Sequence, residues 1–173
     1  HRMLQNISSE IRDRILERFR EVFDIVDQSD NPEEIHGLVN SFQSDPNQSA
    51  SHQMNFGIMI QPGPSFQVAT LKESFVSYSP LEKCHSWFLS QTILEPILGS
   101  QETLVEKGQL TFTHEASDVL KNVGNDSCQL GLLLPPVNLD VFEQVVKSGR
   151  RMPIKSTYFS PKLPTGLVLN KVE

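Results

Sequence analysis

The sequence predicts an α+β fold, with a mixed or largely antiparallel sheet and helices packed on one face. Apolar segments of strand length alternate along the chain with segments whose apolar residues recur at helical spacing. Two of the strand-like segments, residues 54–60 and 66–71, are joined by a turn rich in proline and glycine, which is typical of an antiparallel hairpin. The 173 residues, 38% of them hydrophobic, are enough for one buried core, so we expect a single domain over residues 1–173.

Two helices are predicted ahead of the hairpin. Residues 9–23 place apolar side chains at helical spacing, with charges of alternating sign on the other face. The apolar residues 23–26 fit either a strand or the end of this helix. Asn31 and Pro32 then supply the N-cap and the first-turn proline of a second helix. Residues 44–53 are polar and lack periodicity, so we expect a flexible loop there.

The second half of the chain predicts further helices and strands. A capping pattern at Ser79 predicts a helix with apolar positions as far as Leu94, and Pro96 marks its end or a kink. Asn138 is an N-cap and Gly149 ends the helix that follows it. The other elements expected from the pattern are strands at residues 110–113, 128–134 and 166–169 and helices at residues 115–123 and 138–146.

Composition and residue spacing argue against a membrane protein, a metal site and a nucleic-acid partner. No apolar run is long enough to cross a bilayer and no signal-peptide pattern precedes the first helix, so we expect no membrane partner and a cytoplasmic location. Cys84 and Cys128 lie in apolar segments, which predicts buried thiols. No pair of histidines has metal-site spacing, so we expect no metal. Basic and aromatic residues are not interleaved, apart from Tyr158 and Phe159, and nucleic acid is not an expected partner.

One stretch has a charge opposite to that of the whole chain. The formal net charge is -6, yet residues 147–171 carry six basic side chains and no acidic one, and such a cluster attracts anions. Within it, Lys155, Ser156 and Thr157 place an ammonium group beside two hydroxyls, which can hold phosphate oxygens. The glycines of a P-loop are absent from this stretch, so it is not a Walker motif. The alternative is a solvated basic loop that leads into the last strand.

Several segments resemble one protein family. Apart from Ile154 and Ser160, residues 152–163 (MPIKSTYFSPKL) and the following TGLV resemble the C-terminal signature of the domain of unknown function 1015 family. Residues 93–99 (ILEPILG) and 132–135 (LLLP) resemble two internal segments, and the initial HR resembles part of a mid-chain PTHR segment. Family members carry an upstream half with an ADGHHR motif that does not occur here. The resemblance therefore implies that this chain is a C-terminal half whose N-terminal half is a missing partner.

The basic cluster and the resemblance together predict a phosphate-bearing ligand, either a nucleotide or a phosphorylated metabolite. The reaction expected is phosphoryl transfer shared with the missing half, because that chemistry depends on positioning and charge neutralisation. The sequence identifies no catalytic residue and no defined cofactor. The alternative is a non-catalytic module that docks through residues 152–162, with Tyr158 and Phe159 as anchors. The expected ligand-binding residues are Arg151, Lys155, Ser156, Thr157 and Lys162.

Overall fold

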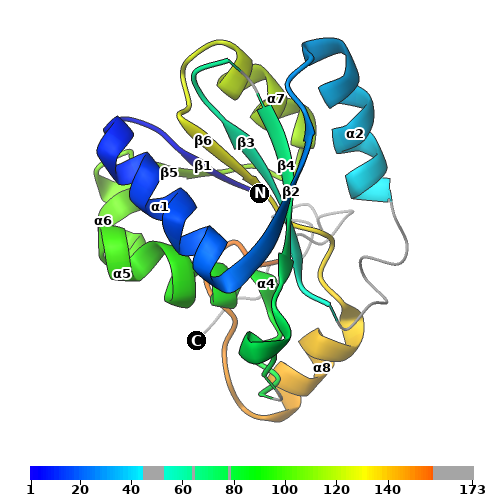
Figure 1. Ribbon diagram of the computed structural model, residues 1–173. Helices are drawn as coiled ribbons and strands as arrows, with labels where there is room; N and C mark the ends of the chain where they lie inside the picture. Colours follow the sequence, from blue (N-terminus) through cyan, green and yellow to red (C-terminus); the bar gives the residue numbers. More distant parts are fainter. Residues whose placement is uncertain (45–52, 64, 78, 158–173) are drawn as a thin grey trace, which may run out of the picture.

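The computed structural model describes residues 1–44, 53–63, 65–77 and 79–157. Within them six strands form one sheet in the order β2-β4-β3-β6-β1-β5, and all five neighbouring pairs are antiparallel (Figure 1). The predicted α+β class with a largely antiparallel sheet is confirmed. The strands are β1 (Arg2–Leu4), β2 (Phe23–Ser29), β3 (Asn55–Ile60), β4 (Ser65–Leu71), β5 (Leu110–Phe112) and β6 (Leu130–Leu133).

Helices cover both faces of the sheet, where the sequence led us to expect one covered face. In Figure 1, α1, α5 and α6 lie on one side of the strands and α2 and α7 on the other. The reason is that central strands are apolar on both sides: in β3, Phe56 and Ile58 join one core, whereas Met59 joins the second. The helices are α1 (Ser9–Val22), α2 (Pro32–Ser44), the 3-10 turn η1 (Glu73–Phe75), α4 (His85–Phe88), the π-helix η2 (Leu89–Leu94), α5 (Glu95–Leu98), α6 (Gln101–Glu106), α7 (Ala116–Gly124) and α8 (Leu139–Lys147).

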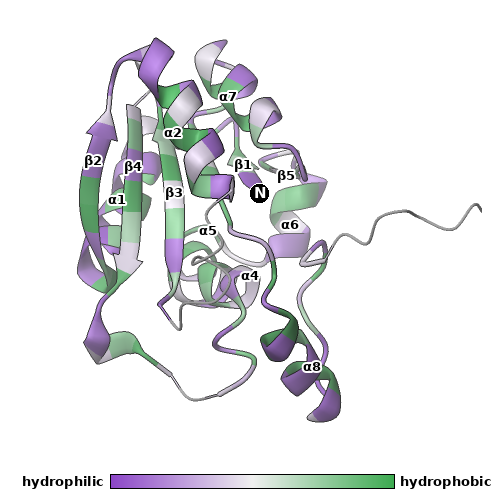
Figure 2. Ribbon diagram, turned by 90° about the vertical axis from the view of Figure 1, so that its right-hand side faces the viewer, coloured by the Kyte–Doolittle hydropathy of each residue, from purple (hydrophilic) through white to green (hydrophobic). Residues whose placement is uncertain are grey.

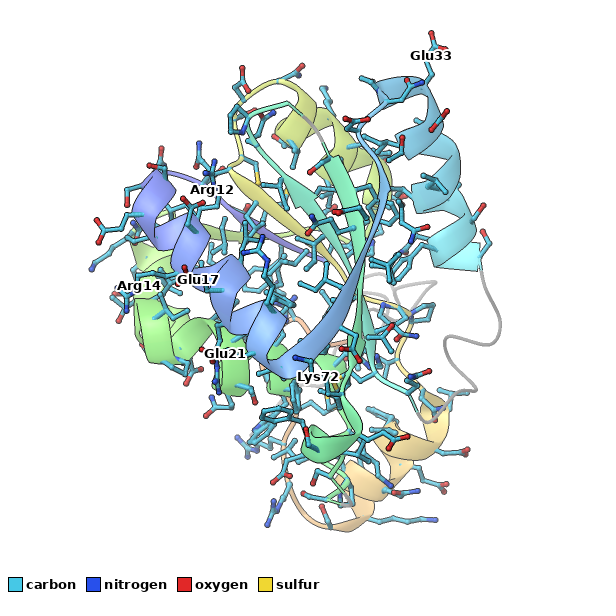
Figure 3. All side chains as sticks on the ribbon, viewed as in Figure 1. Arg12, Arg14, Glu17, Glu21, Glu33 and Lys72 are labelled. Carbon is cyan, nitrogen blue, oxygen red and sulfur yellow. The ribbon has the colours of Figure 1, made fainter. Side chains whose placement is uncertain are left out.

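The first helix shows how local signals set the boundaries of an element. Ser8 caps α1 by accepting a hydrogen bond from the backbone N–H of Ile11 at 3.3 Å. Phe23 then takes an extended backbone, with φ -123°, and begins β2, which decides between the two alternatives left open for residues 23–26. The ammonium group of Lys72 donates to the last carbonyls of α1, those of Arg20 at 2.6 Å and Glu21 at 3.1 Å, and so satisfies its C-terminal end (Figure 3).

The helical stretch that follows the hairpin begins later and runs further than predicted. Ser79 starts only a turn, because Cys84 has an extended backbone and delays α4 until His85. The chain then continues through the π-helix η2 and past Pro96, whose missing N–H falls in the first turn of α5, where no intrahelical partner is needed. Gly99, at φ +87°, ends this stretch.

Three elements were not predicted: the short strand β1, the 3-10 turn η1 and the helix α6. The predicted loop at 44–53, apart from its two ends, and the predicted strand at 166–169 lie outside the described residues. Helix α8 lies at one end of the molecule, beyond the end of the sheet (Figures 1 and 2). In the described part of the chain, no helix has the length and apolar character needed to span a bilayer.

Candidate functional site

A pocket of about 410 Å³ lies at one end of the sheet. Because β1 runs antiparallel to β5 and β6, its first residues lie beside the last residues of those two strands. The chain closes the pocket with four further segments, namely Gln43 of α2, the segment at the start of α4, the stretch from the end of β6 into α8, and residues 155–157. The site is therefore assembled from segments that lie far apart in the sequence.

Arg2 is the most deeply buried charged group in the pocket lining. Its side chain is only 2% exposed, and its guanidinium carbon lies 4.4 Å from the centre of the Phe112 ring. The guanidinium donates to the carbonyl oxygens of His1, Ile154 and Lys155, each at 3.4 Å. Burial lowers the pKa of Arg2 to about 10, so the group remains protonated at neutral pH. Its Nε atom has no hydrogen-bond partner among the described residues.

The segment around Lys155 is fastened at two points. Arg2 holds it through the two carbonyls just described, and Ser86 Oγ donates to Ser156 Oγ at 2.6 Å. Ser156 Oγ in turn donates to the carbonyl oxygen of Pro153 at 2.6 Å. Lys155 itself has φ +56°, a left-handed conformation that is uncommon and costly for a residue with a side chain. These contacts restrain the segment in this conformation.

Three imidazoles line the same pocket, those of His1, His85 and the exposed His114. The Nδ1 atom of His1 accepts from the backbone N–H of Leu134 at 3.2 Å, so its hydrogen resides on Nε2, which is buried and has no described partner. The ring of His85 packs edge-on against Phe56, with 5.4 Å between ring centres. Burial lowers the pKa of His85 to about 4, so this imidazole is neutral at pH 7. His1 Nε2–H and Arg2 Nε–H are thus two buried donors that protein acceptors in the described chain do not use.

The charge of the lining has one sign. Arg2, Lys83 and Lys155 contribute three cationic side chains, and the described lining contains no aspartate or glutamate. A nearby carboxylate, that of Glu115, is paired with His114 at 3.2 Å and lies outside the lining. A pocket with three cations, unused N–H donors and no carboxylate provides a favourable environment for an anion.

The structure brings together three of the predicted ligand residues and leaves one apart. Lys155, Ser156 and Thr157 all line the pocket. Arg151 is exposed and does not line it, because the chain between Gly149 and Pro153 runs outside the pocket wall. The other predicted residues, Tyr158, Phe159 and Lys162, lie outside the described residues.

Sequence reasoning did not assign a role to several residues that the fold places here. His85 packs against Phe56 and also lines the pocket. The available signals were weak: an arginine directly before an apolar run, and the resemblance of the initial HR to a family segment. The lining residues that were missed include His1, Arg2, Lys83, His85 and Ser86.

In the described residues no group of three or more His, Cys, Asp or Glu side chains is placed to hold a metal ion. Cys84 and Cys128 are both buried and unpaired, as predicted. No protein-family model, no curated protein and no solved structure matches this chain. The resemblance to the domain of unknown function 1015 family therefore stays a prediction.

Proposed function

We propose that the pocket at the end of the sheet binds an anionic, phosphate-bearing ligand. The observation that carries the proposal is the position of Arg2, which is almost fully buried in the pocket lining and has no carboxylate partner among the described residues. Arginine is always charged at neutral pH, and a buried charge is costly unless it is paired. A bound anion would pair it.

The groups around Arg2 suit phosphate in particular. A phosphate group presents several acceptor oxygens, and the lining offers the ammonium group of Lys155, the hydroxyl of Thr157 and the unused N–H groups of Arg2 and His1. The left-handed conformation of Lys155 also supports the proposal, because strained backbone that is held by surrounding contacts is common at ligand sites.

The experiment is isothermal titration of inorganic phosphate and of ATP into the chain of residues 1–173. Lys155→Ala removes one cationic contact, and we expect it to weaken phosphate binding about tenfold, since hydrogen bonds to charged groups contribute ~1.5–3 kcal/mol. Lys121→Ala is the matched control: it removes the same charge from an exposed position of α7 that does not line the pocket. Affinity should also fall as ionic strength rises.

Equal phosphate affinity in the Lys155→Ala and Lys121→Ala variants, or no binding by the parent chain, would refute the proposal. The docking alternative makes the opposite prediction, because its anchors are Tyr158 and Phe159. If Tyr158→Ala abolishes binding to a separately produced upstream half while phosphate has no effect, the docking function is supported instead.

Our proposal also covers the reaction at the site and its location in the cell. We propose that it acts in phosphoryl transfer together with an upstream half, as the family resemblance implies, and in the cytoplasm. Two buried free thiols, Cys84 and Cys128, support a reducing compartment, where unpaired cysteines persist. Titration of ATP into the chain joined to an upstream half from a family member, compared with the chain alone, tests the shared site.

A further inference from the structure

We infer that the ligand of this pocket is a phosphomonoester whose phosphate is joined to an apolar body, such as a flat ring or a branched aliphatic group. The inference rests on the proposed function, and it comes from the part of the lining that phosphate does not use. Besides the cationic groups, the pocket is lined by nearly all residues of a stretch that runs from the end of β6 through the first turn of α8. We call this stretch, residues 134–142, the apolar wall.

The apolar wall consists almost entirely of side chains that make no hydrogen bonds. Its polar members are Asn138 and Asp140, and the side-chain oxygen of Asn138 is occupied, since it accepts from the backbone N–H groups of Asp140 at 2.9 Å and Val141 at 3.2 Å. Asp140 is exposed and does not line the pocket. The apolar residues of the wall that line the pocket are Leu134, Pro135, Pro136, Val137, Leu139, Val141 and Phe142.

Leu139 is the residue of the wall that most needs an explanation. It lines the pocket, yet 76% of its surface is exposed, the highest value among the large apolar side chains of the described residues. In α8 only Val145 is buried, so Leu139 is not covered by the packing of its own helix. A ligand with an apolar body would remove Leu139 from water, whereas inorganic phosphate alone would leave it exposed.

The size of the pocket agrees with such a ligand. A volume of about 410 Å³ lies within the ~300–1,000 Å³ of typical small-molecule sites, which combine a few polar groups with a largely apolar lining. A phosphate group fills only a fraction of it. The remaining space adjoins the apolar wall, and the two prolines at positions 135 and 136 restrict the backbone of that wall.

The test compares the affinities of two ligands with the same charge, methyl phosphate and phenyl phosphate, by isothermal titration. We expect phenyl phosphate to bind at least tenfold more tightly, because its ring would remove on the order of 100 Å² of apolar surface from water at ~25 cal/mol per Å². The Leu139→Ala variant should reduce this preference several-fold. Val146→Ala is the matched control, an exposed apolar residue of the same helix that does not line the pocket.

The outcomes separate this inference from the proposed function. Equal binding of the two ligands, both weakened by Lys155→Ala, would retain the phosphate site and overturn the apolar body. An unchanged preference in Leu139→Ala together with Phe142→Ala would overturn the assignment of the apolar wall. If neither ligand binds, the proposed function fails and the inference fails with it.

Discussion

Replacing Arg2 by methionine tests whether the buried guanidinium serves the ligand or the fold. Methionine is long, flexible and apolar, so it can fill the space beside Phe112 without carrying a charge. The ligand hypothesis predicts that Arg2→Met weakens phosphate binding at least tenfold and makes the ligand-free protein more stable. A site that binds an anion holds an unpaired buried charge when no anion is bound, and the substitution removes the desolvation cost of that charge.

The magnitude follows from the environment of the side chain. Burial lowers the pKa of Arg2 from its ordinary value to about 10, which corresponds to a cost of about 3 kcal/mol for holding the charge in the folded state at neutral pH. The substitution also loses three long hydrogen bonds at 3.4 Å and the contact with the Phe112 ring, together worth roughly 1–2 kcal/mol. The expected net gain in the free energy of unfolding is about 1–2 kcal/mol.

The assay is urea unfolding in phosphate-free buffer, followed by circular dichroism and by the fluorescence of the single tryptophan, Trp87. For a chain of this length the gain corresponds to a rise in Tm of about 2–8 °C. Arg2→Lys keeps the charge without the planar fork and should show no such gain. If Arg2→Met instead lowers the free energy of unfolding by 2 kcal/mol or more, Arg2 is a structural clamp for residues 154–155 and the reasoning is refuted.

Two further predictions concern the sheet and the buried imidazole. Gly131→Ala would place a Cβ against Val119 Cγ1, so we expect the free energy of unfolding in urea to fall by about 2–3 kcal/mol. Gly37→Ala in α2, where nothing lies within 4 Å of the added Cβ, should be neutral or slightly stabilising. Equal effects of the two substitutions would contradict the close packing of α7 on β6. His85 has a pKa of about 4 in the folded protein and 6.5 in the unfolded chain, so between these pH values its imidazole is protonated only in the unfolded chain. The free energy of unfolding therefore rises with pH across this window, by up to about 3 kcal/mol. Unfolding free energies of the parent and His85→Gln, measured from pH 4 to 7, should converge at the acidic end, and parallel curves would argue against a buried neutral imidazole.

The elements that could be predicted from the sequence are those with a strong local signal. The cap at Asn138 and the apolar periodicity of α1 depend on residues within a few positions of one another. The hairpin of β3 and β4 has the same advantage, because its turn connects its own two strands. Local physics decided these elements, and they formed as expected.

The missed elements depend on distant partners. Strand β1 has only three residues and forms because β5 and β6 flank it on both sides, more than a hundred positions later in the chain. The use of both faces of the sheet likewise depends on how α2 and α7 return to it, and the apolar residues of β3 do not specify which helix covers them. A short segment of sequence does not specify which distant strand pairs with it or which helix covers it.

The residues of the candidate site also fall into those with a local sequence signal and those that depend on distant parts of the chain. Lys155, Ser156 and Thr157 could be predicted because an ammonium group and two hydroxyls stand together in the sequence. Arg2 and Ser86 could not, since their relation to that cluster exists only after the sheet has formed. Arg151 was predicted from charge alone, and charge does not determine whether a side chain lines a pocket or faces solvent.

The position of His1 in the pocket lining has a practical consequence for anyone who handles this protein. Whatever polypeptide is joined ahead of His1, whether a purification tag or an upstream domain, leaves the sheet beside the pocket. A polyhistidine tag would bring its own imidazoles to a cationic pocket, so titrations should be repeated after its removal. The same geometry offers a tool: a fluorophore attached just before His1 would report directly on the arrival of a ligand.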